Sequence, residues 1–128
     1  MSRQPIETPD APAAIGPYSQ AIRAGDTVWL SGQIPLDPAT GQIVGATAAE
    51  QAEQCMKNLG AVLTAAGCGF EHLARCTLFL TDLRDFAAVN AVYARYMPDP
   101  PPARACVEVS RLPRDVKVEI DGVAWRPR

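Results

Sequence analysis

The sequence is poor in the residues that build metal centres and disulfide frameworks. It holds one histidine, His72, and four cysteines, which are far apart and form no Cys-x-x-Cys pair. A structural zinc site needs four such ligands at short spacing, so neither a metal nor another cofactor is expected. The cysteines are instead expected to be buried thiols that pack as small apolar side chains. They are Cys55, Cys68, Cys76 and Cys106.

The chain also lacks a basic excess and a long apolar run. Lys and Arg number 12 and Asp and Glu number 14, which gives a formal net charge of -2. Nucleic acids and anionic membranes bind basic faces, so neither is expected as a partner. The longest uncharged stretches, such as residues 58–70, are shorter than the ~20 apolar residues that span a bilayer. The N-terminus has no apolar signal-peptide core, which predicts a cytoplasmic protein.

What the chain does contain is typical of one globular domain. Apolar residues make up 48% and charged residues 20% of its 128 positions, close to the average for folded proteins. A chain of this length buries enough surface for an unaided core. We therefore expect a single domain over residues 1–128. Four of the twelve prolines lie within the first seventeen residues, so residues 1–16 are expected to be extended or irregular.

The pattern of apolar residues predicts two helices among five strands. Two strand-like runs between residues 18 and 34 flank Ala24-Gly25-Asp26, which indicates a hairpin. Thr47 and Glu50 fit a capping box, and the apolar residues that follow recur with helical spacing as far as Gly67. A strand over 75–81 precedes a second helix. Alternating strands are expected over 103–109 and 116–125.

The second helix is expected to be capped by Asp82 and to end before Pro98. Its inward stripe is Phe86, Asn90, Tyr93 and Met97. The resulting order, β-β-α-β-α-β-β, predicts an α+β fold in which two helices pack on one face of a mixed sheet.

The alternation in the last two predicted strands places an arginine and a carboxylate on the same face of the sheet. Ala105, Val107 and Val109 are expected to face the helices, which places Arg104, Cys106 and Glu108 on the open face. Glu119 falls on the open face of the following strand by the same alternation. Two interpretations stay open at this point: cross-strand ion pairs on a solvated face, or an anion-binding arginine beside a general base.

Asn90 is an amide in an otherwise apolar stripe. A buried amide without partners costs about 1–3 kcal/mol, so it needs hydrogen bonds. Asn90 either ties down a loop backbone, which is the commoner role, or supports a site.

Five segments together resemble a known family. They are Ile-Gly-Pro-Tyr at 15–18, Ser-Gly-Gln-Ile at 31–34, Phe-Ala-Ala-Val-Asn at 86–90, Pro-Ala-Arg-Ala-Cys-Val-Glu-Val at 102–109 and Val-Lys-Val-Glu-Ile at 116–120. The chain is similar, from about residue 12 to residue 125, to the reactive intermediate deaminases, the RidA-like or YjgF family.

The resemblance implies a chorismate-mutase-like fold and a homotrimer with sites between subunits. It also implies hydrolysis of 2-imino acids, such as 2-iminobutanoate and 2-iminopropanoate, to 2-oxo acids and ammonia. By the same resemblance, Arg104 binds the substrate carboxylate, Cys106 contributes its backbone and Glu119 handles the attacking water. Tyr18, Ser31 and Gly32 line the site, and Asn90 supports it.

Three alternatives compete with the deaminase. One is a binding module for 2-oxo or amino acids without turnover. The second is an endoribonuclease or translation inhibitor, against which the net charge counts; the third is a stress-activated holdase. The sequence departs from the family's usual pattern at Ala105, where serine is common, and in a short proline-rich connector over 97–102.

Overall fold

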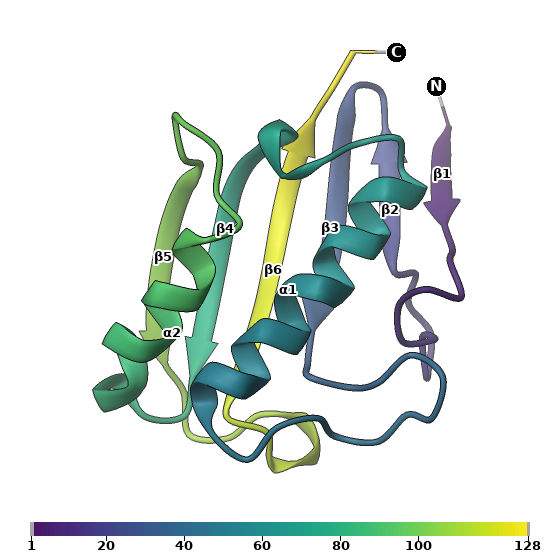
Figure 1. Ribbon diagram of the computed structural model, residues 1–128. Coiled ribbons are helices and arrows are strands. Elements are labelled where there is room, and N and C mark those ends of the chain that lie inside the picture. The colour runs from purple at the N-terminus through teal and green to yellow at the C-terminus, as the bar shows by residue number, and fades with distance from the viewer. Residues whose placement is uncertain (1, 128) are drawn as a thin grey trace.

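Six strands form one mixed sheet in the computed structural model, which describes residues 2–127. The spatial order is β1-β2-β3-β6-β4-β5, and only β4 and β5 run parallel. Both helices lie on the same face of this sheet (Figure 1), which confirms the predicted α+β fold. The elements are β1 (Arg3–Ile6), β2 (Ala21–Ala24), β3 (Thr27–Gln33), α1 (Ala48–Ala65), β4 (Leu73–Leu80), α2 (Phe86–Ala94), β5 (Ala103–Glu108) and β6 (Val118–Trp125).

Helix α1 begins and ends where the sequence predicts. The Glu50 amide donates to Thr47 Oγ1, and Glu50 Oε1 accepts from the Thr47 amide, so the capping box is formed. The helix ends before Gly67, whose φ of +76° suits glycine. Its inward side fills the core against β6 with fully buried residues, among them Met56, Leu59, Val62 and Leu63.

The predicted hairpin is also present. Ala24 pairs with Thr27, so Gly25 and Asp26 form the two-residue connection between β2 and β3. Three of the four cysteines are buried free thiols, as expected, and Cys106 is partly buried.

The N-terminal segment is more regular than the sequence indicated. Residues 3–6 form β1, which extends the sheet beside β2. The Gln20 side chain, which is 3% exposed, then holds the following loop. Its amide nitrogen donates to the carbonyls of Thr8, Ala11 and Pro12, and its oxygen accepts from the Thr8 amide. These contacts replace the sheet hydrogen bonds that a proline-rich loop cannot make.

The second helix is shorter than predicted. Asp82 caps a turn of 3-10 helix, Leu83–Asp85, by accepting from the Arg84 amide, and α2 begins only at Phe86. It ends at Ala94, so Met97 lies beyond it. The remaining members of the predicted stripe, Phe86, Asn90 and Tyr93, do lie on α2.

Strand β5 faces the opposite way from our prediction. Ile120 pairs with Leu78 and Leu78 pairs with Cys106, so these three side chains share the helix-covered face. Arg104 and Glu108 therefore also point to the helices, and Ala105 and Val107 point to the open face. Every residue of β5 is exposed or half-buried because it is an edge strand. Its alternation therefore carried no hydropathy signal for which face is covered.

Candidate functional site

Glu119 lies on the open face of β6 opposite an irregularity in β3. Leu30 pairs with Gly122 and Gln33 pairs with Ile120, so β3 carries one residue more than β6 across this stretch. The extra residue forms a β-bulge at Ser31-Gly32, a feature that commonly redirects side chains beside active sites. The Glu119 carboxylate lies directly against Gly32, in space that a β-carbon at position 32 would occupy.

The environment of Glu119 makes its carboxylate a stronger base than usual. Half-burial raises its pKa, and the neighbouring carboxylate of Asp121, two residues along the same face, raises it further. No described cation lies within ion-pair distance of Glu119. A desolvated carboxylate with a raised pKa is suited to accept a proton from water.

A cavity of about 510 Å³ opens in front of Glu119. Tyr18, Ser31 and Gly32, which the sequence assigned to the site, all line it. Sequence reasoning missed Gln33, Pro113 and Arg114. Gln33 directly follows the Ser-Gly pair, and the turn at 113–115 directly precedes the strand of Glu119, so proximity in sequence was the available signal. The other lining residues are Pro12, Ala13, Ile15, Gln20, Ile34 and Leu36.

Hydrogen bonds from one buried amide and one hydroxyl group hold the walls of this cavity. Asn58 on α1 is 1% exposed and donates to the carbonyls of Ile34 and Leu36. It performs the loop-tethering role that the sequence offered as one interpretation of Asn90. On the other wall, Ser31 Oγ donates to the Ser19 carbonyl at 2.6 Å.

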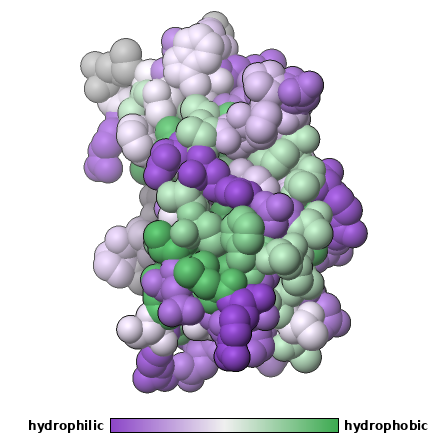
Figure 2. All heavy atoms as spheres, turned by 90° about the vertical axis from the view of Figure 1, so that its left-hand side faces the viewer, coloured by the Kyte–Doolittle hydropathy of each residue, from purple (hydrophilic) through white to green (hydrophobic). Residues whose placement is uncertain are grey.

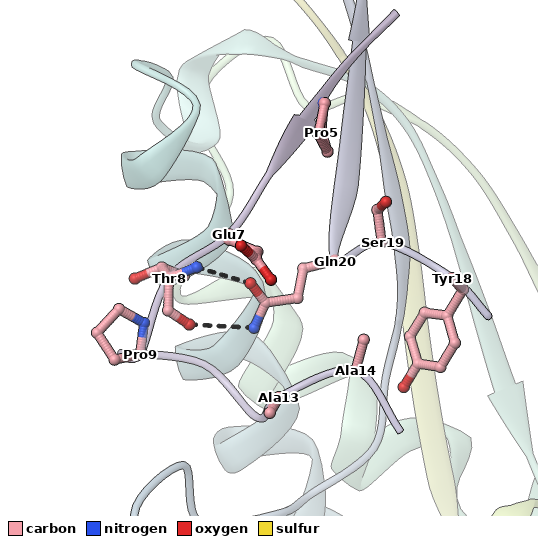
Figure 3. A pocket seen from close by; sticks show the side chains of 9 residues that line it. All are labelled: Pro5, Glu7, Thr8, Pro9, Ala13, Ala14, Tyr18, Ser19 and Gln20. Atoms are coloured by element: carbon pink, nitrogen blue, oxygen red, sulfur yellow. Dashed lines mark hydrogen bonds between the residues drawn. The ribbon is translucent and has the colours of Figure 1, made fainter. Parts of the chain in front are cut away.

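A second cavity shares Ala13, Tyr18 and Gln20 with the first. That second cavity, of about 490 Å³, lies between β1 and the loop that follows it, with Glu7 and Ser19 in its wall. Figure 3 shows the paired hydrogen bonds between Gln20 and Thr8 that frame it. The Tyr18 side chain is half-exposed at the boundary, and its hydroxyl oxygen accepts a long hydrogen bond of 3.4 Å from the Ile15 amide.

Arg104 forms a separate centre at the other edge of the sheet. Its Nη1 donates to Asn90 Oδ1 at 2.5 Å. Its guanidinium carbon lies 5.4 Å from the centroid of the Phe86 ring and 5.1 Å from that of Tyr93, both within cation–π range. No carboxylate of residues 2–127 pairs with Arg104. A shallow cavity of about 380 Å³ beside it is lined by Asn90, Tyr93, Ala94, Pro101, Pro102 and Arg104.

The backbone of Cys106 lies on the outer edge of the same strand. Val109 donates to the Leu80 carbonyl, and in a parallel ladder alternate residues direct their amides to the same neighbour. Residues 105 and 107 therefore pair with β4, and the amide of Cys106 points out from the sheet edge. Partial burial raises the pKa of the Cys106 thiol, an effect that Arg104 opposes, so the thiol is neutral at pH 7.

Arg104 and Glu119 do not meet within one chain. They lie on opposite faces of the sheet, and β4 separates their strands. The prediction that both project into one layer is therefore wrong, and so is the cross-strand ion pair. The structure instead divides the candidate residues into a Glu119 half-site with Tyr18, Ser31 and Gly32, and an Arg104 half-site with Asn90 and Cys106.

Metal-ligand clusters and membrane-spanning helices are both absent from the described residues. Within residues 2–127, no three His, Cys, Asp or Glu side chains gather as metal ligands would. Among the helices of the same residues, none has the length and apolar character needed to span a bilayer.

The chain is similar to known proteins over nearly its whole length. The model of the family described as Endoribonuclease L-PSP matches residues 8–126. Protein DfrA of Myxococcus xanthus is 59% identical over 126 residues, which cover 97% of this chain and 96% of that protein. The 2-iminobutanoate/2-iminopropanoate deaminase of Mus musculus is 48% identical over 122 residues, which cover 95% of this chain and 90% of that protein.

A solved structure extends the similarity to the fold. The crystal structure of E. coli TdcF with bound serine matches with a TM-score of 0.90 and 45% identity, over 96% of this chain and 98% of that one. The chain therefore belongs to the Endoribonuclease L-PSP family, which is the YjgF or RidA family.

Proposed function

We propose that this protein hydrolyses reactive 2-imino acids to 2-oxo acids and ammonia, at sites completed by two copies of the chain. The proposal rests above all on one observation: Arg104 is held in a fixed geometry and has no carboxylate partner among the residues that the structure describes. A guanidinium kept free in this way is suited to bind the planar carboxylate of a ligand through two parallel hydrogen bonds. The name of the mouse relative and the serine bound to TdcF are consistent with a ligand of the amino-acid class.

The chemistry needs only the groups that the two half-sites supply. The carbon of a protonated imine is already electrophilic, so a water molecule can attack it once a base removes a proton. Glu119 accepts that proton while the C–O bond forms, which gives a tetrahedral aminoalcohol. Glu119 returns that proton to nitrogen, which makes ammonia the leaving group. The C–N bond then breaks while the hydroxyl group loses its own proton to Glu119, so ammonia leaves and the carbonyl of the 2-oxo acid forms.

A second copy is required because Arg104 and Glu119 occupy opposite faces. In the proposed homotrimer, the Arg104 half-site of one subunit lies against the Glu119 half-site of the next. Cyclic symmetry repeats such a head-to-tail contact until the ring closes. The Cys106 amide on the open edge of β5 would add a backbone donor beside Arg104.

The surface of the β5 edge is consistent with such an assembly. Figure 2 shows the side on which β5 and α2 lie, with apolar side chains gathered at its middle and hydrophilic ones around them. Val107 of β5 is 40% exposed and Leu83, just before α2, is 46% exposed. Trp29 and Trp125 add exposed apolar surface on the open face. Apolar area of this kind is stabilised when another subunit covers it.

The test couples the protein to a threonine dehydratase, which releases 2-iminobutanoate into solution. We expect faster formation of 2-oxobutanoate with the protein than without it, and less trapping of the imine by semicarbazide. Light scattering should give three times the chain mass of 13.7 kDa. An unchanged rate in the presence of the wild-type protein would overturn the proposal, and a monomer would overturn the shared site.

The family description supplies one alternative, ribonuclease activity. The net charge of -2 offers little attraction for RNA phosphates. A synthetic single-stranded RNA incubated with the protein should therefore remain intact. Cleavage that disappears in Glu119→Gln would favour the nuclease. Tight binding of 2-oxobutanoate without imine hydrolysis would favour a binding module instead.

A further inference from the structure

Helix α2 holds the Arg104 guanidinium at three points. Phe86, Asn90 and Tyr93 lie four and three residues apart, so they form one stripe of the helix. The sequence pattern predicted this shared stripe, with Asn90 as its one amide. The structure places all three residues in contact with one arginine: two through ring faces and one through a hydrogen bond.

The three contacts restrict different motions of the guanidinium. The ring faces restrain the plane of the group, because a cation is attracted to the negative face of an aromatic ring. The Asn90 oxygen engages Nη1 and so restrains rotation within that plane. No described residue accepts from Nε or Nη2, which leaves one whole edge of the fork for a carboxylate.

Tyr93 differs from the other two residues in its burial and in its hydroxyl group. Its side chain is 4% exposed, whereas Phe86 and Asn90 are partly exposed. The Tyr93 ring is therefore fixed by the core and provides the firmest surface under the guanidinium. Its hydroxyl is buried beside the Cys76 thiol and has no other hydrogen-bond partner among the described residues. The ring, not the hydroxyl, is the part of Tyr93 that contacts Arg104.

We propose that Tyr93 is a positioning residue: its buried ring fixes the plane of the Arg104 guanidinium for carboxylate binding. The inference deepens the proposed function and rests on it for the identity of the ligand. It assigns to a buried residue an effect on ligand affinity that is exerted through Arg104. It also predicts that the tyrosine hydroxyl is dispensable for this effect.

The test compares variants that change one property of Tyr93 at a time. Tyr93→Phe keeps the ring and removes the buried hydroxyl. Tyr93→Leu removes the ring but keeps an apolar side chain. Replacing Tyr93 with pentafluorophenylalanine keeps a ring of similar shape and reverses the charge distribution of its face, which guards against simple loss of folding. Val89→Ala, a fully buried position on the same helix, is the control for general destabilisation.

The first readout is independent of the reaction. Ring currents of Tyr93 should shift the side-chain NMR signals of Arg104, which are assigned by their absence in Arg104→Lys. We expect these shifts to persist in Tyr93→Phe and Val89→Ala and to shrink in Tyr93→Leu to the part that the Phe86 ring causes. The pentafluorinated variant should show increased exchange of the Arg104 Nε proton. Unchanged Arg104 signals in Tyr93→Leu would overturn the positioning role.

The second readout is the affinity for 2-oxobutanoate, the stable product of the proposed reaction. We expect a Kd about 3- to 30-fold weaker in Tyr93→Leu and in the pentafluorinated variant, the range of a partly desolvated cation–π contact. Tyr93→Phe and Val89→Ala should bind like the wild type. An equal loss in Tyr93→Phe and Tyr93→Leu contradicts the inference, because it would make the hydroxyl the active part. Absence of 2-oxobutanoate binding in the wild type contradicts the proposed function, while the NMR shifts still decide the role of Tyr93.

Discussion

The Glu119 carboxylate lies across the backbone of Gly32 at the bulge in β3, and no side chain fits between them. Glycine at position 32 is therefore a requirement for the position of the carboxylate. The bulge brings the extra residue of β3 opposite Glu119, and the absence of a side chain at Gly32 leaves room for the Glu119 carboxylate.

Gly32→Ala should reduce imine hydrolysis at least tenfold while the protein stays folded. The added β-carbon meets the carboxylate of Glu119, so that flexible side chain must swing away from its place. The coupled dehydratase assay measures the loss. In the Gly32→Ala/Glu119→Gln double variant, activity should fall no further than in Glu119→Gln alone, because the two changes act through one group. Independent, additive losses would contradict this account.

Arg104→Lys and Glu119→Gln should differ in which step they impair. Lysine keeps the charge but loses the two-pronged fork, so 2-oxobutanoate should bind weakly to Arg104→Lys. Glutamine keeps the size of Glu119 but cannot take up a proton, so binding should stay near normal while turnover falls about 10²–10⁴-fold. Calorimetric titration and the coupled assay separate the two effects. Wild-type turnover in Glu119→Gln would remove Glu119 from the role of base.

Mixed oligomers should recover activity that neither parent has. If each site takes Arg104 from one subunit and Glu119 from another, reassembling Arg104→Ala with Glu119→Gln restores some complete sites. Random mixing in equal amounts should restore about one quarter of the sites, because each intact half is present with a probability of one half. Arg104→Ala mixed with Asn90→Ala, two changes in the same half-site, provides a comparison. The proposed shared site fails if the first mixture stays inactive after verified subunit exchange.

Glu119→Gln should stabilise the protein at neutral pH. Burial and Asp121 raise the folded-state pKa of Glu119 above its unfolded value, so the folded chain holds this proton more tightly than the unfolded chain does. Glu119 therefore favours folding most at low pH, and this contribution is lost as the pH rises through the folded-state pKa. The difference in Tm between variant and wild type should be small near pH 4 and larger at pH 7. Thermal denaturation of both proteins between pH 4 and pH 7 measures this difference. A Tm difference that shrinks with rising pH would contradict the raised pKa of Glu119.

Cys106→Ala should retain most of the activity. The proposed contribution of this residue is its outward-facing amide, which alanine preserves, and partial burial raises the pKa of the thiol, which disfavours the reactive thiolate. Imine hydrolysis by the variant is measured in the coupled assay. Complete loss of activity would instead point to chemistry at sulfur.

Local sequence signals determined most helices and strands of this protein but only part of its site. Thr47 and Glu50 fixed the start of α1, and Gly25-Asp26 fixed the hairpin, because these signals act within a few residues. The alternation in β6 placed Glu119 on the open face, since Val118 and Ile120 on either side are strongly apolar and fully buried. The family resemblance named the candidate residues but not their arrangement within one chain.

Only the tertiary structure decided where Arg104 points and what holds it. A strand's period of two fixes which residues share a face, but long-range packing decides which face is covered. In the edge strand β5, both faces carry small or partly exposed residues, so the pattern could not choose between them. The packing of α2 beside β5 decides which face of β5 is covered. Arg104 lies on that covered face, against two aromatic rings and an amide of α2, and is therefore on the opposite side of the sheet from Glu119.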